Sequence, residues 1–444
     1  MPISIEPVWV GIGGICLLFI LLFSGVYIAI ALGISGFIGV LLIIGFKPAT
    51  TLLATTFFYY SINYAFIVVP LFVVMGLFAA ETEICKDSYD AMAKWFGRIK
   101  GGLGLATVGG CTIFGTLTGS SIVTSVVFAK ISVPEMVRFG YDKKISYGLV
   151  SSAGSIGMMI PPSLLVVLYA LITEDSVGQL LMGGIGPGLT LAFCLGGCFI
   201  LLQIIRPHLT PPTTGMSAAW KERFISLTKL WPAIVVATVV IGGIYTGIFT
   251  VVEAAGIGAF VLFSLFIVSQ KFSRETWPKL AACLRETISL TAMVLFIIVS
   301  ARLFSRLLVL SDLGRIMTIF IISAKLSSIG FLVAATALYL LLGCFIDGFS
   351  ILAITVPIFL PVVDSLGIDR IWFAMLMIVA TQIGLVTPPV GLSVYAVKGV
   401  AGTDISLEDI FRGVLPFFVA LLVTQAILIS FPIISTWIPY HIMK

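Results

Sequence analysis

Long apolar runs separated by short polar segments make up most of this chain. In the first half, the apolar runs cover residues 8–24, 26–46, 53–80, 145–172 and 180–205. A helix needs about 20 predominantly apolar residues to cross a bilayer, so this pattern predicts a series of membrane-spanning helices. One polar segment among them, ETEICKDSYDAMAKWFGRIK, ends at Lys100 and is expected to form an amphipathic helix.

After this amphipathic stretch the pattern changes to two shorter, glycine-rich apolar arms. They cover residues 101–136 and meet at residues 115–121, in the sequence GTLTGSS. Each arm has roughly 13 to 15 residues, which is too few to span a bilayer. We therefore expect a re-entrant hairpin that enters and leaves the membrane on one side.

The run at residues 145–172 is interrupted by SAGSIGMMIPPS, which contains Pro161 and Pro162. A proline pair removes two backbone donors and clashes with the preceding turn of a helix. This run therefore predicts a helix that is broken near its middle.

The broken helix recurs when the sequence is shifted along itself by one fixed offset. Pro161 and Pro162 then fall on Pro388 and Pro389, in the sequence ATQIGLVTPPVGLS. Self-similarity at one fixed offset is typical of an internal repeat. We interpret the chain as two repeats and a linker, at residues 1–217, 228–444 and 218–227.

Each repeat is expected to cross the membrane five times in addition to its hairpin. The second repeat has its hairpin near residues 327–362, its broken helix at residues 371–397 and a last span near residues 410–438. An odd number of crossings makes the second repeat inverted relative to the first, as in many transporters. Most of the 25 Lys and Arg residues then lie on one side. The positive-inside rule assigns this side to the cytoplasm, so both termini are expected outside.

Composition supports the membrane assignment and excludes other classes. The chain is 59% hydrophobic and only 10% charged, which is too little charge to cover a soluble protein of 444 residues. The net charge of +5 is scattered over short loops, which argues against nucleic acid as a partner. No GxxxxGK loop and no catalytic motif occurs, so we expect neither nucleotide binding nor an enzyme, and an ion gradient must supply the energy. Seven cysteines without a CxxC pair and two histidines give no metal site other than one for sodium.

The two broken helices and the two hairpin tips are the candidate functional sites. Backbone groups freed inside a membrane must be satisfied by protein, water or a bound ligand. Hydroxyl and carbonyl oxygens suit a hard cation such as sodium, and half-helix N-termini suit anionic groups. The predicted sodium-binding residues are Gly119, Ser120, Ser121, Gly154, Asp347, Gly348, Gly384 and Thr387. The predicted substrate cleft is formed by Ser155, Pro161, Pro162, Ser163, Pro388, Pro389, Gly391 and Ser393. The alternative is that these small residues only allow tight helix packing.

Asp347 is the one charged residue in LLLGCFIDGFSILAITVPIF. A carboxylate inside the membrane suggests a sodium ligand or a proton carrier, whereas a helix cap is the structural alternative. Arg302, Arg306 and Glu253 also lie in or beside apolar runs, and we expect them to be interface anchors rather than substrate ligands.

With these segments identified, the chain resembles the large membrane subunit of the tripartite ATP-independent periplasmic (TRAP) transporters, the DctM-like family. The resemblance covers nearly the whole chain. It rests on YAFIVVPLFVVMG, on GSS followed by VPEM, on SAGSIGMMIPPS, on FIDGFSILAITVPIFLPVV and on GIDRIWFAMLMIVATQIGLVTPPVGLSVYAV.

The resemblance implies an elevator-type transporter in the bacterial inner membrane, in which hairpins and broken helices move against a scaffold of outer spans. It implies sodium-driven uptake of an organic acid, a carboxylate delivered by a periplasmic substrate-binding protein, and a small four-span membrane subunit as a second partner. The alternative is a self-sufficient sodium- or proton-coupled carboxylate symporter that needs no partner subunits. A channel or an intramembrane scaffold without ion coupling is the remaining class.

Overall fold

The computed structural model describes residues 6–209, 219–271, 273–323 and 326–442, and these residues form helices and no strands. The all-α fold expected from the apolar runs is confirmed. The predicted linker at residues 218–227 begins outside the described residues, and from Trp220 onward it is helical.

The first repeat contains thirteen helical elements up to Ile205. These are α1 (Pro7–Phe23), α2 (Ile28–Ile44), α3 (Phe46–Ile62), η1 (Tyr64–Ile67), α4 (Val68–Ala80), α5 (Ile84–Phe96), α6 (Gly102–Thr118), α7 (Ser121–Arg138), α8 (Lys143–Ala153), η2 (Gly154–Met158), α9 (Leu164–Thr173), α10 (Val177–Gly183) and α11 (Ile185–Ile205). A short turn, η3 (Pro207–Leu209), follows.

The remaining elements begin with the helix that covers the expected linker. They are α12 (Trp220–Thr228), α13 (Trp231–Ala237), η4 (Thr238–Gly242), α14 (Gly243–Tyr245), α15 (Val251–Ser269), α16 (Thr276–Leu310), α17 (Leu313–Ser323), α18 (Ser328–Gly343), α19 (Gly348–Ser365), α20 (Arg370–Val386), α21 (Leu392–Ala401), α22 (Leu407–Ser430) and α23 (Ile433–Ile442).

Local capping signals explain why corresponding helices of the two halves begin where they do. Asp142 precedes α8 and its Oδ1 accepts a hydrogen bond of 3.0 Å from the Ile145 amide. Asp369 precedes α20 and its Oδ1 accepts one of 2.8 Å from the Trp372 amide. Such caps satisfy amides that have no acceptor inside the helix. The two aspartates are separated by the same offset as Pro161 and Pro388, so the offset found in the sequence also relates helix starts. The inverted orientation of the two halves remains a prediction.

Five helical segments of the described chain are long and apolar enough to cross a membrane: Val177–Ile205, α15, α16, α19 and α22. Two bent pairs raise this number to seven if each pair counts as one span. In one pair, α3 continues through η1 into α4, and in the other, α12 continues into α13. The expected five crossings in each repeat therefore remain a prediction.

The arms of the first hairpin are longer than predicted. The first hairpin, hairpin 1, consists of α6 and α7, with 17 and 18 residues. The second, hairpin 2, consists of α18 and α19, with 16 and 18 residues. The expected length of 13 to 15 residues for the arms of hairpin 1 was wrong because α7 continues through Pro134 to Arg138. In hairpin 2, α19 likewise continues through two prolines to Ser365. Arm length alone therefore does not distinguish these hairpins from spans.

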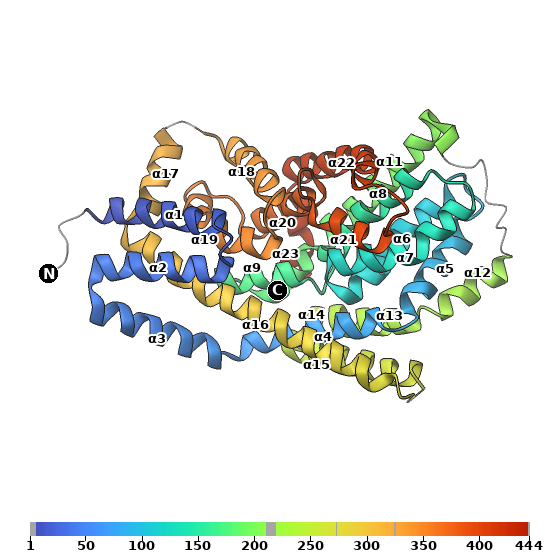
Figure 1. Ribbon diagram of the computed structural model, residues 1–444, viewed down its shortest axis with the longest axis horizontal. Coiled ribbons are helices and arrows are strands. Elements are labelled where there is room, and N and C mark those ends of the chain that lie inside the picture. The colour runs from blue at the N-terminus through green and yellow to red at the C-terminus, as the bar shows by residue number, and fades with distance from the viewer. Residues whose placement is uncertain (1–5, 210–218, 272, 324–325, 443–444) are drawn as a thin grey trace.

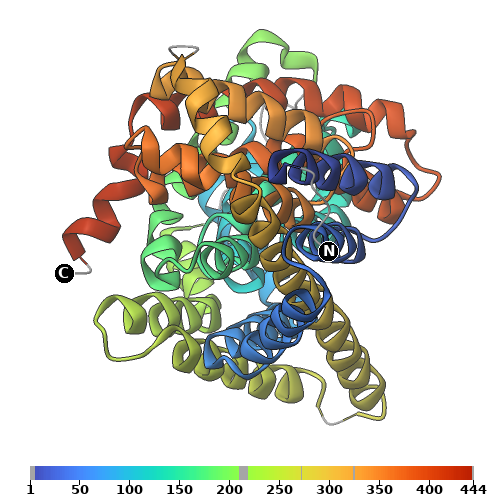
Figure 2. The same ribbon diagram turned by 90° about the vertical axis from the view of Figure 1, so that its left-hand side faces the viewer.

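The helices form an outer layer and a central group. In both views α3, α4, α13, α15 and α16 lie along one side of the molecule, and α16 is the long helix that runs diagonally across it (Figure 1, Figure 2). Within this outer layer α15 and α16 pack on α4, and α16 also packs on α2. The central group contains both hairpins and both broken helices, and α22 and α11 pack against it through α8 and α6. Large buried side chains such as Phe114, Phe128 and Phe373 fill its interior.

Candidate functional site

The tip of hairpin 1 lies directly against the break between α8 and α9. A methyl group on Gly115 would lie 2.5 Å from the Cα of Gly157, so the two backbones are in contact. Gly119, with φ of +58°, ends α6 and lies against the carbonyl of Pro162. Only glycine fits both the left-handed conformation and this close approach.

Hydroxyl groups gather at this first contact. Ser120 caps α7, and its Oγ accepts from the Val123 amide at 3.4 Å. Ser121 is 1% exposed, and its hydroxyl has no hydrogen-bond partner in the described structure. Gly154, at the start of η2, packs against the Ser121 carbonyl and the Ser125 side chain. The structure thus brings together the four residues predicted for the first sodium site, Gly119, Ser120, Ser121 and Gly154.

The break itself is buried. Ser155 donates to the Ser152 carbonyl, and Ser163 caps α9 while donating to the Met158 carbonyl. Pro161 and Pro162 are also buried. The two serines satisfy carbonyls of the unwound segment, as expected for irregular backbone inside a membrane protein.

The tip of hairpin 2 meets the second broken helix in the same manner. A methyl group on Gly384 would lie 2.6 Å from the Cα of Gly343. Gly348, the first residue of α19, lies against Thr381 and against Leu165 of the first repeat. Both glycines therefore lie where hairpin 2 meets α20, Gly348 against Thr381 and Gly384 against Gly343.

Asp347 caps α19. Its Oδ1 accepts from the amides of Phe349 and Ser350 at 3.0 and 3.1 Å, and its Oδ2 accepts from the Ser350 hydroxyl. The geometry therefore matches the capping alternative considered above. A role as sodium ligand or proton carrier stays a prediction.

The second break is more open than the first. Pro388 and Pro389 are exposed, whereas Pro161 and Pro162 are buried. Thr387 ends α20 and donates to the Ile383 carbonyl at 2.6 Å. The predicted cleft residues Gly391 and Ser393 lie on the far side of this break, where Gly391 packs against Phe411 and Ser393 is buried in α21.

The two candidate sites are connected by helices that pack across the repeats. α7 packs against α21, and α19 packs against α9. Between the breaks, Gln382 Nε2 donates to the Sδ of Met158 at 3.0 Å. Gln382 was not among the predicted site residues, although a glutamine in an otherwise apolar stretch indicates a polar contact inside the protein.

A cavity of about 180 Å³ lies between hairpin 1 and the outer layer. Its lining residues are Val73, Gly76 and Leu77 of α4, Thr118, Ser120, Ile122 and Val123 of hairpin 1, Met158, Leu164, Phe349 of hairpin 2, and Glu286, Leu290 and Val294 of α16. It is lined by Ser120, which is predicted to bind sodium, and by Leu164, which follows the predicted cleft residue Ser163. Glu286 was not among the predicted site residues, because it belongs to α16 of the outer layer and not to a hairpin or a broken helix.

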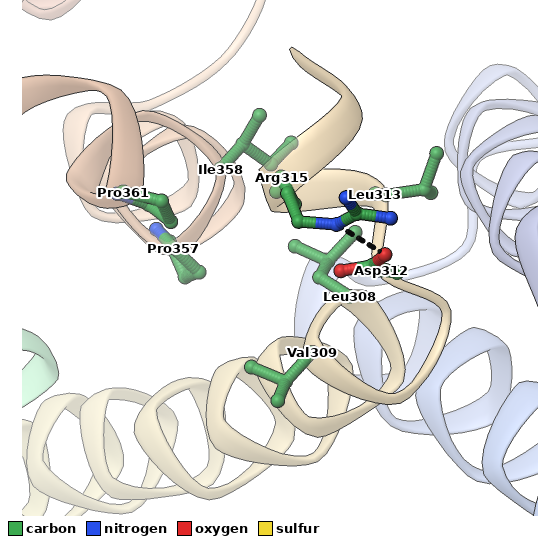
Figure 3. A pocket seen from close by; sticks show the side chains of 9 residues that line it. Leu308, Val309, Asp312, Leu313, Arg315, Pro357, Ile358 and Pro361 are labelled. Atoms are coloured by element: carbon green, nitrogen blue, oxygen red, sulfur yellow. Dashed lines mark hydrogen bonds and ion pairs between the residues drawn. The ribbon is translucent and has the colours of Figure 1, made fainter. Parts of the chain in front are cut away.

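A second cavity, about 190 Å³, lies near the end of α16 (Figure 3). Leu308, Val309 and Pro357 line it, and the ion pair between Arg315 and Asp312, with an N–O distance of 2.6 Å, closes one side. It contains none of the predicted site residues.

Arg302 makes its contacts within the protein, and its expected role as an interface anchor stays a prediction. Its guanidinium lies 2.7 Å from Glu174 Oε1, donates to the Leu171 carbonyl at 3.0 Å and stacks on the Tyr60 ring. It thereby joins α16 of the outer layer to the end of α9. Glu253 also has a local role, since it forms a capping box with Thr250 at the start of α15.

Comparison with known proteins agrees with the resemblance to the large membrane subunit of TRAP transporters. The family model described as "Tripartite ATP-independent periplasmic transporter, DctM component" matches residues 15–434. The C4-dicarboxylate TRAP transporter large permease protein DctM of Pseudomonas aeruginosa is 34% identical, over 92% of this chain and 93% of that protein. The ectoine TRAP transporter large permease protein TeaC of Halomonas elongata is 28% identical, over 84% of this chain and 85% of that protein. Among solved structures, the YdaH transporter of Alcanivorax borkumensis has a similar fold, with a TM-score of 0.61, 16% identity and 89% of each chain covered.

Proposed function

Because the chain belongs to the DctM family of tripartite ATP-independent periplasmic transporters and is a TRAP large permease subunit, we propose that it drives sodium-coupled uptake of an organic acid. In this proposal the chain is a transporter and not an enzyme. It takes a carboxylate across the bacterial inner membrane and uses the sodium gradient in place of nucleotide.

The observation that supports this proposal is the paired contact of each hairpin tip with a broken helix. Each contact brings two glycine backbones together, at Gly115 with Gly157 and at Gly343 with Gly384. Carbonyls and hydroxyls at such contacts are suitable ligands for sodium. Duplicated sites would let the transporter couple more than one ion to each substrate molecule. One charge that moves across 100 mV contributes about 2.3 kcal/mol, so two sodium ions suffice to concentrate a monoanion strongly.

The proposed assembly has three components. A periplasmic substrate-binding protein delivers the carboxylate, and a small four-span membrane subunit packs beside this chain. Both termini lie in the periplasm, and the central group moves against the outer layer as in an elevator. The exposed apolar side chains of α1 and α3, such as Trp9, Phe23 and Phe58, are available for lipid or for the small subunit.

Reconstitution into proteoliposomes tests this function. Uptake of labelled succinate and labelled ectoine would be measured under an inward sodium gradient, with this chain, the small subunit and the binding protein of its own organism. We expect uptake only when all three components and the gradient are present. Uptake by this chain alone would instead support the self-sufficient symporter, and passage without any ion gradient would support a channel.

A further inference from the structure

Arg223 of α12 carries a buried positive charge that no described residue neutralises. The residue is only 7% exposed. Its Nε and Nη2 atoms have no hydrogen-bond partner in the described structure, and it forms no ion pair with any described residue. Asp87 of the adjacent helix α5 pairs with Lys229 instead, at an N–O distance of 3.8 Å. A buried charge is strongly unfavourable without a partner, so this guanidinium is suited to an anion from outside the described chain.

The contacts that hold Arg223 leave its N–H groups free. α12 packs on α5 (Figure 1). Trp95 Nε1 of α5 donates to the Arg223 carbonyl at 3.2 Å, and the guanidinium carbon lies 5.0 Å from the centre of the Trp220 ring. Stacking on an aromatic ring uses the face of the guanidinium and not its N–H donors. The donors therefore remain available for an acceptor.

α12 has the features of a helix that lies at a membrane surface. Trp220, Phe224 and Ile225 are large apolar residues, yet they are 62%, 58% and 50% exposed. The helical stretch that follows, Trp231–Tyr245, is bent by 53° relative to α12. Exposed tryptophan and phenylalanine on a short helix that leads into an apolar one are typical of the membrane–water interface.

The surroundings of this helix are basic. Lys221 is exposed on α12, Lys94 directly precedes Trp95, and Lys100 follows the end of α5. Glu222, the acidic residue of α12, accepts a hydrogen bond of 3.3 Å from the Ala219 amide. The positive-inside rule assigns these basic residues to the cytoplasmic side, where basic clusters attract the headgroups of anionic lipids.

We propose that Arg223 binds the phosphodiester group of an anionic phospholipid at the cytoplasmic membrane surface. Nε and Nη2 lie on one edge of the guanidinium, so they can donate in parallel to two oxygens of one phosphate. The exposed Trp220 ring turns aside to admit the phosphate, and the acyl chains lie against Phe224 and Ile225. This inference goes beyond the proposed function, because it concerns a lipid that is bound and not transported. The lipid would fix the start of the second repeat to the membrane surface.

Thermal unfolding of the full chain, depleted of lipid in a neutral detergent, tests this site. The chain would be titrated with phosphatidylglycerol, with phosphatidylcholine or with inorganic phosphate. The chains compared are wild type, Arg223→Gln, Arg223→Lys and Lys221→Gln. The last is a matched control, because it removes the same charge from the same helix but from an exposed side chain.

We expect phosphatidylglycerol to raise the Tm of the wild type and of Lys221→Gln in a saturable manner. Phosphatidylcholine should act more weakly, because its cationic head faces the same lysines, and inorganic phosphate should have no effect. Arg223→Gln should weaken the apparent affinity for phosphatidylglycerol about tenfold, as for loss of charge-assisted hydrogen bonds. Arg223→Lys should be intermediate, since an ammonium group cannot make two parallel bonds to one phosphate. Without lipid, Arg223→Gln should be at least as stable as the wild type, because it removes a buried charge without a partner.

Three results would overturn the inference. One is an equal response to phosphatidylglycerol in Arg223→Gln and the wild type. Another is equal weakening in Lys221→Gln and Arg223→Gln, which would indicate attraction to general surface charge. The third is a response to phosphatidylcholine or inorganic phosphate that matches the response to phosphatidylglycerol. If Arg223→Gln does not fold, Arg223→Lys decides between the same outcomes. None of these results involves sodium or the substrate, so each would leave the proposed function intact.

Discussion

Ser120 and Asp347 occupy the same position in the two hairpins. They correspond under the offset that relates the two repeats, and each is the N-cap of its hairpin's second arm. The Ser120 hydroxyl accepts a hydrogen bond from one backbone amide, whereas the Asp347 carboxylate accepts hydrogen bonds from two backbone amides and one hydroxyl group. The two hairpin tips therefore have the same N-cap position but differ by one negative charge. Because of this difference, substitution of Asp347 and substitution of Ser120 can be used to test the two tips separately for ion binding.

Asp347→Asn separates capping from ion binding. Asparagine is an equally good N-cap, so the variant should unfold at the wild-type temperature in choline chloride. If the carboxylate contributes to a sodium site, the rise in Tm on titration with sodium chloride should shrink. A site filled at 100 times its Kd adds about 2.7 kcal/mol, which such a titration resolves readily. Asp347→Ala should lose about 1 kcal/mol in choline as well, because the cap is lost.

The contradicting outcome for Asp347 is a full sodium response in Asp347→Asn together with a lower Tm in Asp347→Ala. That combination would mean that Asp347 only caps α19. Thr387→Ala in the second break, tested in parallel, would then show whether the second site binds sodium through hydroxyl and carbonyl oxygens alone.

Ser121→Ala should have effects of opposite sign in the two salts. The Ser121 hydroxyl is buried without a partner in the described structure, and an unsatisfied buried polar group costs about 1–3 kcal/mol. In choline chloride the alanine variant should therefore be as stable as the wild type or more so. In sodium chloride it should be less stable, because the ion loses a ligand. Ser132→Ala is the control on the same helix, since that serine is buried but bonded to the Phe128 carbonyl. A lower Tm of Ser121→Ala in both salts would contradict the assignment.

The hairpin tips and the helix breaks could largely be predicted from the sequence, because both need glycine, proline and small polar residues inside an apolar chain. The spacing of Pro161 and Pro388 and the sequence GTLTGSS predict both breaks and the first tip without any tertiary information. The cavity could not be predicted in this way. Glu286 reaches it only because α16 crosses hairpin 1, and that crossing depends on packing between distant segments. The ion pair of Arg302 could not be predicted either, because its partner Glu174 belongs to the other repeat.

Gly384→Ala tests the close contact of hairpin 2 with the second break. The added methyl group would lie 2.6 Å from the Cα of Gly343, so one backbone must shift. Overpacking of this kind costs about 1–3 kcal/mol, and we expect a lower Tm together with loss of uptake. Gly399→Ala in α21 is the matched control, since no described atom lies within 4 Å of the position that its added methyl group would take. Alanine is favoured over glycine in a helix by about 0.5–1 kcal/mol, so the control should be slightly stabilised. Equal Tm values for the two variants would show that the hairpin is not held against the break.

The contact between Arg302 and Glu174 should appear as a coupling energy in a double-mutant cycle. The Arg302 side chain is 21% exposed and that of Glu174 is 64% exposed, so the pair is partly screened and should contribute about 0.2–1 kcal/mol. Arg302→Gln should cost more than Glu174→Gln, because it also removes the hydrogen bond to the Leu171 carbonyl and the stacking on Tyr60. The double variant should cost less than the sum of the single ones, as measured by thermal unfolding at low ionic strength. Arg285→Gln is the control, because Arg285 lies 17 residues before Arg302 in α16, roughly 25 Å away along the helix, and it should show no coupling to Glu174→Gln beyond the error of the measurement. Strict additivity for Arg302 and Glu174 would mean that this ion pair does not hold α9 against the outer layer.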